Sequence, residues 1–353
     1  MASEQRRRAN GGGMKPMKFP FTDAGNARSA VSSAVRAAVT PIGAVLVETR
    51  RDTVPPVTEE DPEDLLMQEA PKLPSLPPGA IGTILIESGR LATEAAERVF
   101  RHHQERGVPF GQAAVELGLL EVADVQFALA RQFAFPLVPR NDTSIAPEVV
   151  AAFNPAHQTV EQLHHLREQL MLSGFGSSPE RKAVAITSAE RNAGRSFVAA
   201  NLAVVFAQLG QRTLLLDAHL QRPRQHQLFR SENRVGLSTV LAERATNEAI
   251  LRHPSLPALS LLPAGPSAPN PQDLLARPSF AALLQSLGDR FDVLILDGPP
   301  WLEGLGARMV AAAAASSLII ARTRCTPADG AARVARELSD ARITTYGVVL
   351  NRH

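Results

Sequence analysis

From residue 181 onward, short apolar runs alternate with segments of helical periodicity. The strand candidates are KAVAITSA, TLLLDA, LSLLPAG, DVLILDGPP, SLIIARTR and TYGVVLN. Most of them are continuously apolar, as expected of strands that are covered on both faces. Helical patterns lie between most of these runs, and this alternation predicts an α/β domain with a doubly wound, mostly parallel sheet. Ligands of such folds bind at the carboxyl ends of the strands.

The first strand candidate is followed by ERNAGRSFVAANLA, in the order strand, Gly-containing turn and helix. If Gly194 is the second Gly of the phosphate-binding pattern G-x-x-x-x-G-K-[ST], Ala189 stands at the first Gly. Arg195 then takes the Lys position, and Ser196 supplies the hydroxyl expected on magnesium. Backbone N–H groups of the loop and the following helix N-terminus favour phosphate. Taken alone, the loop is explained equally well as a structural strand–turn–helix unit.

Two further strand candidates end in aspartate, the first at Asp217 and the second at Asp297. In a magnesium site of this kind, a strand-end carboxylate holds the ion or its waters while the loop holds the phosphates. A lone strand-end aspartate is more often a turn or cap residue. A phosphate-type loop followed by two such aspartates is a more specific signal, and it predicts a nucleotide site.

The N-terminal half carries weaker signals. Residues 1–76 are rich in Gly, Pro and acidic residues, and we expect them to be disordered. Residues 77–140 contain two similar copies, in which Gly82 corresponds to Gly111. Each copy predicts two short helices, with Thr93 or Asp124 as the cap of the second. We expect a linker at 141–158 and the α/β domain at 159–353.

The composition excludes several classes of protein. The single Cys, Cys325, excludes an internal disulfide and a Cys-rich zinc site, and it fits a reducing cytoplasm. An aromatic content of 5% and a net charge of +2 argue against a nucleic-acid-binding platform. No apolar run reaches the ~18 residues of a membrane span, so we expect any membrane role to come through a partner.

Together, these motifs resemble the bacterial tyrosine kinases of polysaccharide export, of the exopolysaccharide chain-length-determinant type, in the MinD-like branch of P-loop ATPases. The matching stretches are ITSAERNAGRSFVAANLA, LLLDAHLQRPRQHQLF, NRVGLSTVLA, LLPAGPSAPNPQDLL, FDVLILDGPP and GVVLN.

The repeat at 77–140 resembles the N-terminal domain of type II secretion ATPases. Some members of that family bind cyclic di-GMP through repeated R-L-G starts. Here the starts read Ala80-Ile81-Gly82 and Pro109-Phe110-Gly111, and both lack the Arg that would grip the ligand. We therefore favour a helical docking or interaction module over a cyclic di-GMP site.

The kinase resemblance implies ATP and Mg²⁺ as cofactors. It implies catalytic roles for Asp217, Arg195 and Asp297, with Asp217 as the candidate for activating the attacking hydroxyl. It places Ser196, Asp217 and Asp297 at magnesium. The residues it implies for ATP binding are Asn192, Ala193, Gly194, Arg195, Ser196 and Phe197 in the loop, and Asn351, which would read adenine.

Several positions depart from the family pattern. His219 replaces the second Asp of D-x-D, and a neutral imidazole offers magnesium no anionic oxygen. Asn192 replaces a loop Gly. Glu161, His164 and Arg167 stand where the family has a ring-assembly motif, although a solvated helix face explains them equally well. The chain has one Tyr, Tyr346, which we expect to be a packing residue; a phosphorylated Tyr-rich tail is not expected.

The resulting hypothesis is a cytoplasmic tyrosine-kinase-like ATPase, peripheral to the inner membrane, that regulates exopolysaccharide chain length or export. Its partner would be a membrane-embedded chain-length regulator. The altered motifs predict weakened nucleotide binding. The alternative is a catalytically inactive nucleotide-binding or scaffold subunit of the export machinery. A MinD-type positioning ATPase fits less well, because it would normally have an intact loop.

Overall fold

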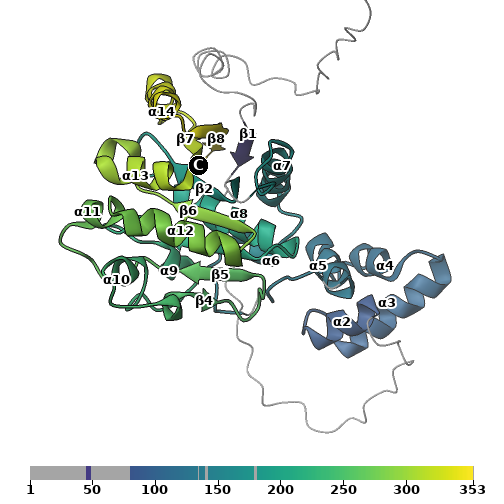
Figure 1. The fold of residues 1–353 in the computed structure, drawn as a ribbon. Helices are drawn as coiled ribbons and strands as arrows, with labels where there is room; N and C mark the ends of the chain where they lie inside the picture. Colours follow the sequence, from purple (N-terminus) through teal and green to yellow (C-terminus); the bar gives the residue numbers. More distant parts are fainter. Residues whose placement is uncertain (1–44, 49–79, 134, 140–141, 179–180, 353) are drawn as a thin grey trace, which may run out of the picture.

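The computed structural model describes residues 45–48, 80–133, 135–139, 142–178 and 181–352 (Figure 1). Its centre is an eight-stranded sheet in the order β1-β8-β7-β2-β6-β3-β5-β4. All neighbours pair in parallel except β4 and β5, so the predicted mostly parallel α/β fold is confirmed. The strands are β1 (Val45–Glu48), β2 (Ala183–Thr187), β3 (Thr213–Asp217), β4 (Leu251–Arg252), β5 (Leu259–Leu262), β6 (Val293–Asp297), β7 (Ser316–Arg322) and β8 (Thr344–Arg352).

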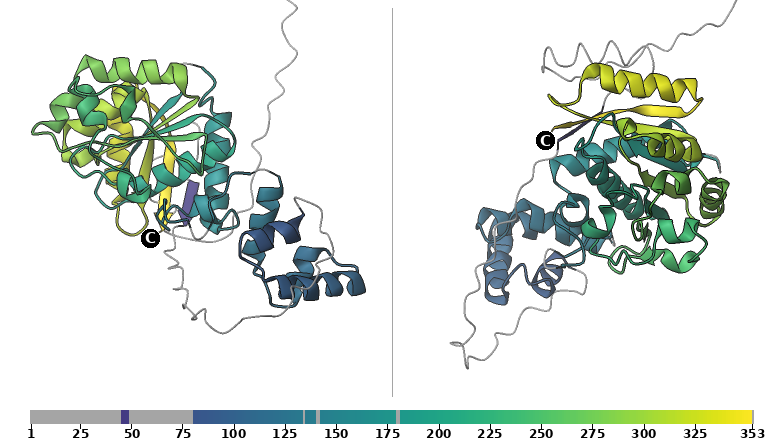
Figure 2. Two further views of the ribbon diagram at one scale, coloured as in Figure 1. Left: turned by 90° about the horizontal axis from the view of Figure 1, so that it is seen from below. Right: turned by 90° about the vertical axis from the view of Figure 1, so that its left-hand side faces the viewer.

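Helices cover both faces of this sheet (Figures 1 and 2). One face carries α6 (Val150–Phe153), α7 (Gln158–Leu172) and α8 (Arg195–Gln208). The other face carries α10 (Leu237–Leu241), α11 (Pro271–Leu275), α12 (Pro278–Arg290), α13 (Leu305–Ala314) and α14 (Ala328–Asp340). Successive residues of one strand alternate between the two cores, with Leu215 on the α8 side and Leu214 and Leu216 on the other. Both faces are therefore dry, which explains the continuous apolar runs.

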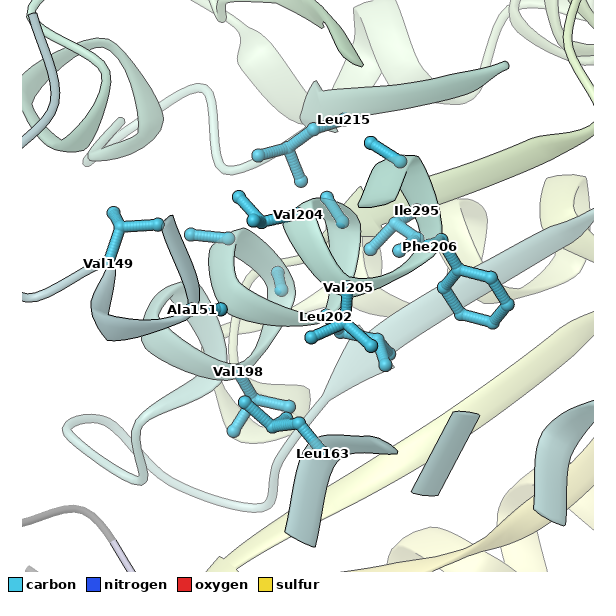
Figure 3. Close-up of a cluster of buried hydrophobic side chains, with 14 of the residues drawn as sticks. Val149, Ala151, Leu163, Val198, Leu202, Val204, Val205, Phe206, Leu215 and Ile295 are labelled. Atoms are coloured by element: carbon cyan, nitrogen blue, oxygen red, sulfur yellow. The ribbon is translucent and has the colours of Figure 1, made fainter. Parts of the chain in front are cut away.

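Helix α8 is the central element of its face. Twelve of its residues are buried, and Val198, Leu202 and Val205 lie in the core between α7 and the strands (Figure 3). A fully buried side chain of this size contributes ~1.5–3 kcal/mol. This packing fixes the position of the helix N-terminus, where the predicted phosphate loop ends.

Residues 81–132 form the predicted pairs of short helices, α2 (Ile81–Glu87), α3 (Thr93–Arg106), α4 (Phe110–Glu116) and α5 (Val122–Gln132), around their own apolar core. The caps differ from the prediction. Ala92 is the N-cap of α3, and Thr93 is its first helical residue. Asp124 lies one turn inside α5 and accepts a hydrogen bond from the N–H of Glu121 at 3.1 Å. Within the described residues, no helix has the length and apolar character needed to cross a membrane.

Two segments correct the expected organisation. Residues 45–48, predicted as part of a disordered segment, form edge strand β1 beside β8. The run VLVE is too short to stand out in sequence, and it is stabilised by pairing with a distant strand; the rest of 1–79 lies outside the described residues. Residues 142–158, predicted as a linker, pack against the α/β core, with Val149 and Ala151 fully buried.

Asn201 of α8 holds this supposed linker. Its Oδ1 accepts a hydrogen bond from the N–H of Ala151 at 2.9 Å, and its Nδ2 donates to the carbonyl of Glu148 at 3.1 Å. Asn201 is fully buried. The segment is thus tied to the same helix that follows the phosphate loop.

We predict that Asn201→Ala lowers the free energy of unfolding by about 2 kcal/mol, because it leaves the buried N–H of Ala151 without its acceptor. Urea denaturation measures this loss, and limited proteolysis should cut faster within 142–158. Gln169→Ala, on the exposed side of α7, is the control. An unchanged cleavage rate in that segment would contradict the anchoring role.

Candidate nucleotide site

The predicted loop lies between the end of β2 and the start of α8. Asn192 and Gly194 both have left-handed backbone angles, with φ of 57° and 95°. Asparagine tolerates this region better than most residues, so the loop keeps its turn without the family Gly at 192. Asn351 of β8 donates from Nδ2 to the carbonyl of Ala193 at 2.9 Å. A Cβ at Gly194 would lie 2.0 Å from that Nδ2, so only glycine fits there.

Arg195 is folded back into the loop. Only 7% of the residue is exposed, and its Nε donates to the carbonyl of Gly298 at 3.0 Å. Its Nη1 donates to Ser188 Oγ and to the carbonyl of Glu190. Burial lowers the pKa of this guanidinium, while Asp297 and Glu303 oppose the change. Arg195 therefore joins both ends of the loop to the segment after β6.

Asp217, at the end of β3, is fully buried. Its Oδ1 accepts from the N–H of His219 at 3.2 Å, and its Oδ2 accepts from those of Arg224 and Gln225 at 2.9 Å each. Burial, and then the neighbouring Asp297, raise the pKa of Asp217 to about 8. The carboxyl group thus holds the start of α9 (Gln225–Leu228), and the hydrogen bonds it accepts from the described residues all come from backbone N–H groups.

Asp297 lies beside Asp217 in register, because β6 and β3 are adjacent. Gln225 Nε2 donates to Asp297 Oδ2 at 2.7 Å and to the carbonyl of Ser196 at 3.1 Å. The backbone N–H of the same residue donates to Asp217, so the fully buried Gln225 connects the phosphate loop to both strand-end aspartates. Sequence reasoning missed Gln225, and the available signal was a glutamine shortly after the strand-end motif.

The structure brings the loop, Asp217, Asp297 and Asn351 to one edge of the sheet. Four other residues named in the sequence analysis lie outside this cluster: Phe197, Glu161, His164 and Arg167. Phe197 is a residue of α8, and its partly buried side chain packs against the hydrophobic core on that face of the sheet. Glu161 is exposed on α7, whereas His164 and Arg167 are half-buried, and Arg167 Nη1 donates to the carbonyl of Val205 at 3.3 Å.

Tyr346 is a packing residue, as predicted. It is 2% exposed, and its ring meets Phe175 edge-on at 5.7 Å between centroids. Burial raises the pKa of its hydroxyl.

The residues at this edge of the sheet can bind magnesium through a small number of protein oxygens, of which Asp297 provides one. Asp297 Oδ1 is buried and has no hydrogen-bond partner among the described residues, so it can serve as a ligand. Asp217 offers less, because it is fully buried and its two oxygens already accept three hydrogen bonds from backbone N–H groups, which leaves one lone pair on Oδ1. No group of three or more His, Cys, Asp or Glu within the described part could hold a metal. Magnesium typically takes one or two protein ligands and completes its shell with water and phosphates, and that is the mode this edge allows.

Comparison with known proteins agrees with this geometry. An AAA domain family model matches residues 181–344. The tyrosine-protein kinase YwqD of Bacillus subtilis (strain 168) is 32% identical over 203 residues, which cover 58% of this chain and 85% of YwqD. The chain belongs to the bacterial tyrosine-protein kinase family.

Other members of this family match over different lengths. The tyrosine-protein kinase etk of Escherichia coli (strain K12) is 29% identical over 273 residues, or 77% of this chain and 36% of that relative. The chain thus spans about a third of that protein. The solved kinase domain of E. coli ETK superposes with a TM-score of 0.56 and 32% identity, over 60% of this chain and 82% of that structure. The chimerical protein CapA2B2 superposes with a TM-score of 0.54 and 27% identity, over 64% of this chain and 97% of that structure.

The raised pKa of Asp217 predicts a pH-dependent stability. Above about pH 4 the unfolded chain releases this proton, while the folded chain keeps it up to about pH 8. The contribution of Asp217 to stability is therefore complete below pH 4 and is lost as the pH rises to about 8. Asp217→Asn removes this dependence, so the Tm of the variant minus that of the wild type should rise by at least ~4 °C from pH 5 to pH 8.5.

Asp292→Asn is the matched control, because Arg212 holds the pKa of Asp292 below its usual value. The stability that Asp292 contributes is lost only in acid, so its Tm difference should stay flat over the same range. A flat profile for Asp217→Asn as well would contradict the assignment. Differential scanning calorimetry measures both series.

Proposed function

We propose that this chain is an Mg²⁺- and ATP-dependent protein-tyrosine kinase or ATPase that controls exopolysaccharide chain length or export. The observation that carries the proposal is the meeting of the phosphate-type loop, Asp297 and the Gln225 bridge at one sheet edge. The names of the relatives and the match of residues 181–344 of this chain to the AAA domain family support it. Since the chain spans only part of the first relatives, their full activity is a proposal here.

In this proposal the loop binds the phosphates of ATP. The first N–H groups of α8 point toward them, and Arg195 supplies positive charge. Asn351 keeps the Ala193 carbonyl in place and lies where the family reads adenine. Ser196 and Asp297 would hold Mg²⁺, which neutralises phosphate charge when bound. In the transfer, the bond from the γ-phosphorus to the ADP oxygen breaks and a bond to the acceptor oxygen forms.

We propose that the phosphorylated group lies on another protein, because Tyr346, the one tyrosine among the 353 residues given, is buried. We propose a membrane-embedded chain-length regulator as partner, which would keep this chain at the inner face of the membrane. Glu161, His164 and Arg167 are proposed to assist assembly of copies. The helices of 77–140 are proposed as a separate docking module, joined to the catalytic part.

The alternative is a regulatory subunit that binds nucleotide without hydrolysing it. The inward-folded Arg195 and the three backbone hydrogen bonds to Asp217 favour this alternative, since both predicted catalytic groups already have partners within the chain. Whether the wild type releases phosphate from bound ATP separates the two functions.

Calorimetric titration of the full chain with ATP and magnesium tests the proposal. Arg195→Met should weaken ATP binding at least ~10-fold, because one charge-assisted phosphate contact is lost. Asp297→Asn should abolish phosphate release. Arg212→Met, which removes an exposed ion pair with Asp292, is the matched control.

The outcomes have different consequences. An absence of binding at millimolar ATP would overturn the nucleotide site as a whole. Binding without any phosphate release by the wild type would overturn the kinase in favour of the regulatory subunit. Binding with release that Asp297→Asn does not change would refute the assignment of Asp297.

A further inference from the structure

His219 and Glu303 form a close pair at the edge of this site. His219 stands where the family has its second aspartate, and it is 7% exposed. Its Nε2 lies 3.6 Å from Glu303 Oε2. Both atoms are buried and have no hydrogen-bond partner among the described residues. The separation slightly exceeds a hydrogen bond, so a shift of a few tenths of an ångström would form one.

Glu303 is held by the phosphate loop itself. Its Oε1 is ion-paired with Arg191 of the loop. Its short helix, η3 (Trp301–Glu303), is fixed by the N–H of Trp301, which donates to the carbonyl of Ser188 at 2.7 Å. The N–H of Leu302 donates to the carbonyl of Ala189 at 3.2 Å. The Glu303 carboxylate therefore reaches the site from η3, whereas the second aspartate of the family motif would stand at position 219, just after β3.

His219 and Glu303 both line a small pocket of about 20 Å³, together with Gln272, Pro299 and other residues. A volume of about 10–15 Å³ is enough for one water molecule or hydroxyl group. The pocket lies beyond the ends of β3 and β6, since His219 and Pro299 each follow a strand-end aspartate by two residues. It offers room for one hydroxyl beside the imidazole.

Asp217 is poorly placed to hold that hydroxyl. Both of its oxygens accept backbone hydrogen bonds at the start of α9 or from His219. The role that the resemblance gives to Asp217 thus needs another group. His219 lines the pocket, and with Nε2 toward Glu303 its other ring nitrogen, Nδ1, is the one left for a ligand.

We propose that His219 holds the hydroxyl of the phosphoryl acceptor by accepting its hydrogen bond, and that Glu303 is the positioning residue that orients the imidazole. The pair takes the place of the second carboxylate of the family motif. This inference rests on the proposed function, because an acceptor is needed only if phosphoryl transfer occurs. An acceptor-binding base oriented by a third group is a recurrent arrangement in catalysis.

Steady-state kinetics of four full-length variants test the pair. Glu303→Gln should lower kcat at least ~10-fold and leave the KM for ATP within ~2-fold, because glutamine keeps the shape of the side chain and an oxygen that accepts a hydrogen bond from Arg191 of the loop. His219→Asp alone should also lower kcat, since it places two carboxylates side by side. The double variant His219→Asp/Glu303→Gln restores one carboxylate and one neutral group, so its kcat should return to within ~3-fold of the wild type. Glu116→Gln, which alters the exposed His102–Glu116 pair at 3.0 Å, is the matched control.

A second measurement needs no nucleotide. The ¹⁵N shifts of the His219 imidazole, assigned by loss of signal in His219→Gln, should show the Nε2–H tautomer in the wild type and a mixture in Glu303→Gln. Glu116→Gln should leave these shifts unchanged.

The outcomes separate the two proposals. A wild type without turnover overturns the proposed function and, with it, the acceptor role of His219. A normal kcat in Glu303→Gln overturns the pair alone. So does a double variant whose kcat falls by the product of the two factors measured for the single variants. Unchanged ¹⁵N shifts in Glu303→Gln also overturn the orienting role of Glu303.

Discussion

The hydrogen bonds of Gln225 connect three parts of this site: the start of α8 and the two strand-end aspartates. Its side-chain Nε2 donates to the carbonyl of Ser196 at the start of α8 and to the carboxylate of Asp297. Its backbone N–H donates to Asp217. The two hydrogen bonds that its buried Nε2 donates link the start of α8 to the end of β6. The relative position of loop and carboxylates is thus set by packing and hydrogen bonds within the chain.

Two buried carboxyl groups on adjacent strands would normally repel each other strongly. Here three backbone N–H groups bind Asp217, and its raised pKa allows a proton to remove one charge. Asp297 keeps one oxygen without a hydrogen-bond partner among the described residues. The two aspartates therefore have different environments although their sequence contexts look alike. One stabilises the loop after β3, and the other is available to a ligand.

The parts that sequence predicted well are those determined locally. Continuous apolar runs identified β2, β3 and β6, and the turn with Gly194 and Ser196 identified the loop, since each pattern lies within about fifteen residues. β1 and the packed segment 142–158 were missed because each depends on a distant partner, Asn201 in the second case. Gln225 could not be ranked above other polar residues without knowing that β3 and β6 are neighbours.

The departures from the family motif are connected in three dimensions. The left-handed Asn192 preserves the loop backbone, and Arg191 next to it holds Glu303 beside His219. Arg195 differs from a lysine in having a planar fork of donors, which lets it reach two carbonyls and a hydroxyl at once. A lysine would have to reach the same three acceptors from a single nitrogen atom. Phosphate must therefore compete with the loop's own carbonyls for Arg195, which makes the opening of these hydrogen bonds part of the free energy of binding nucleotide.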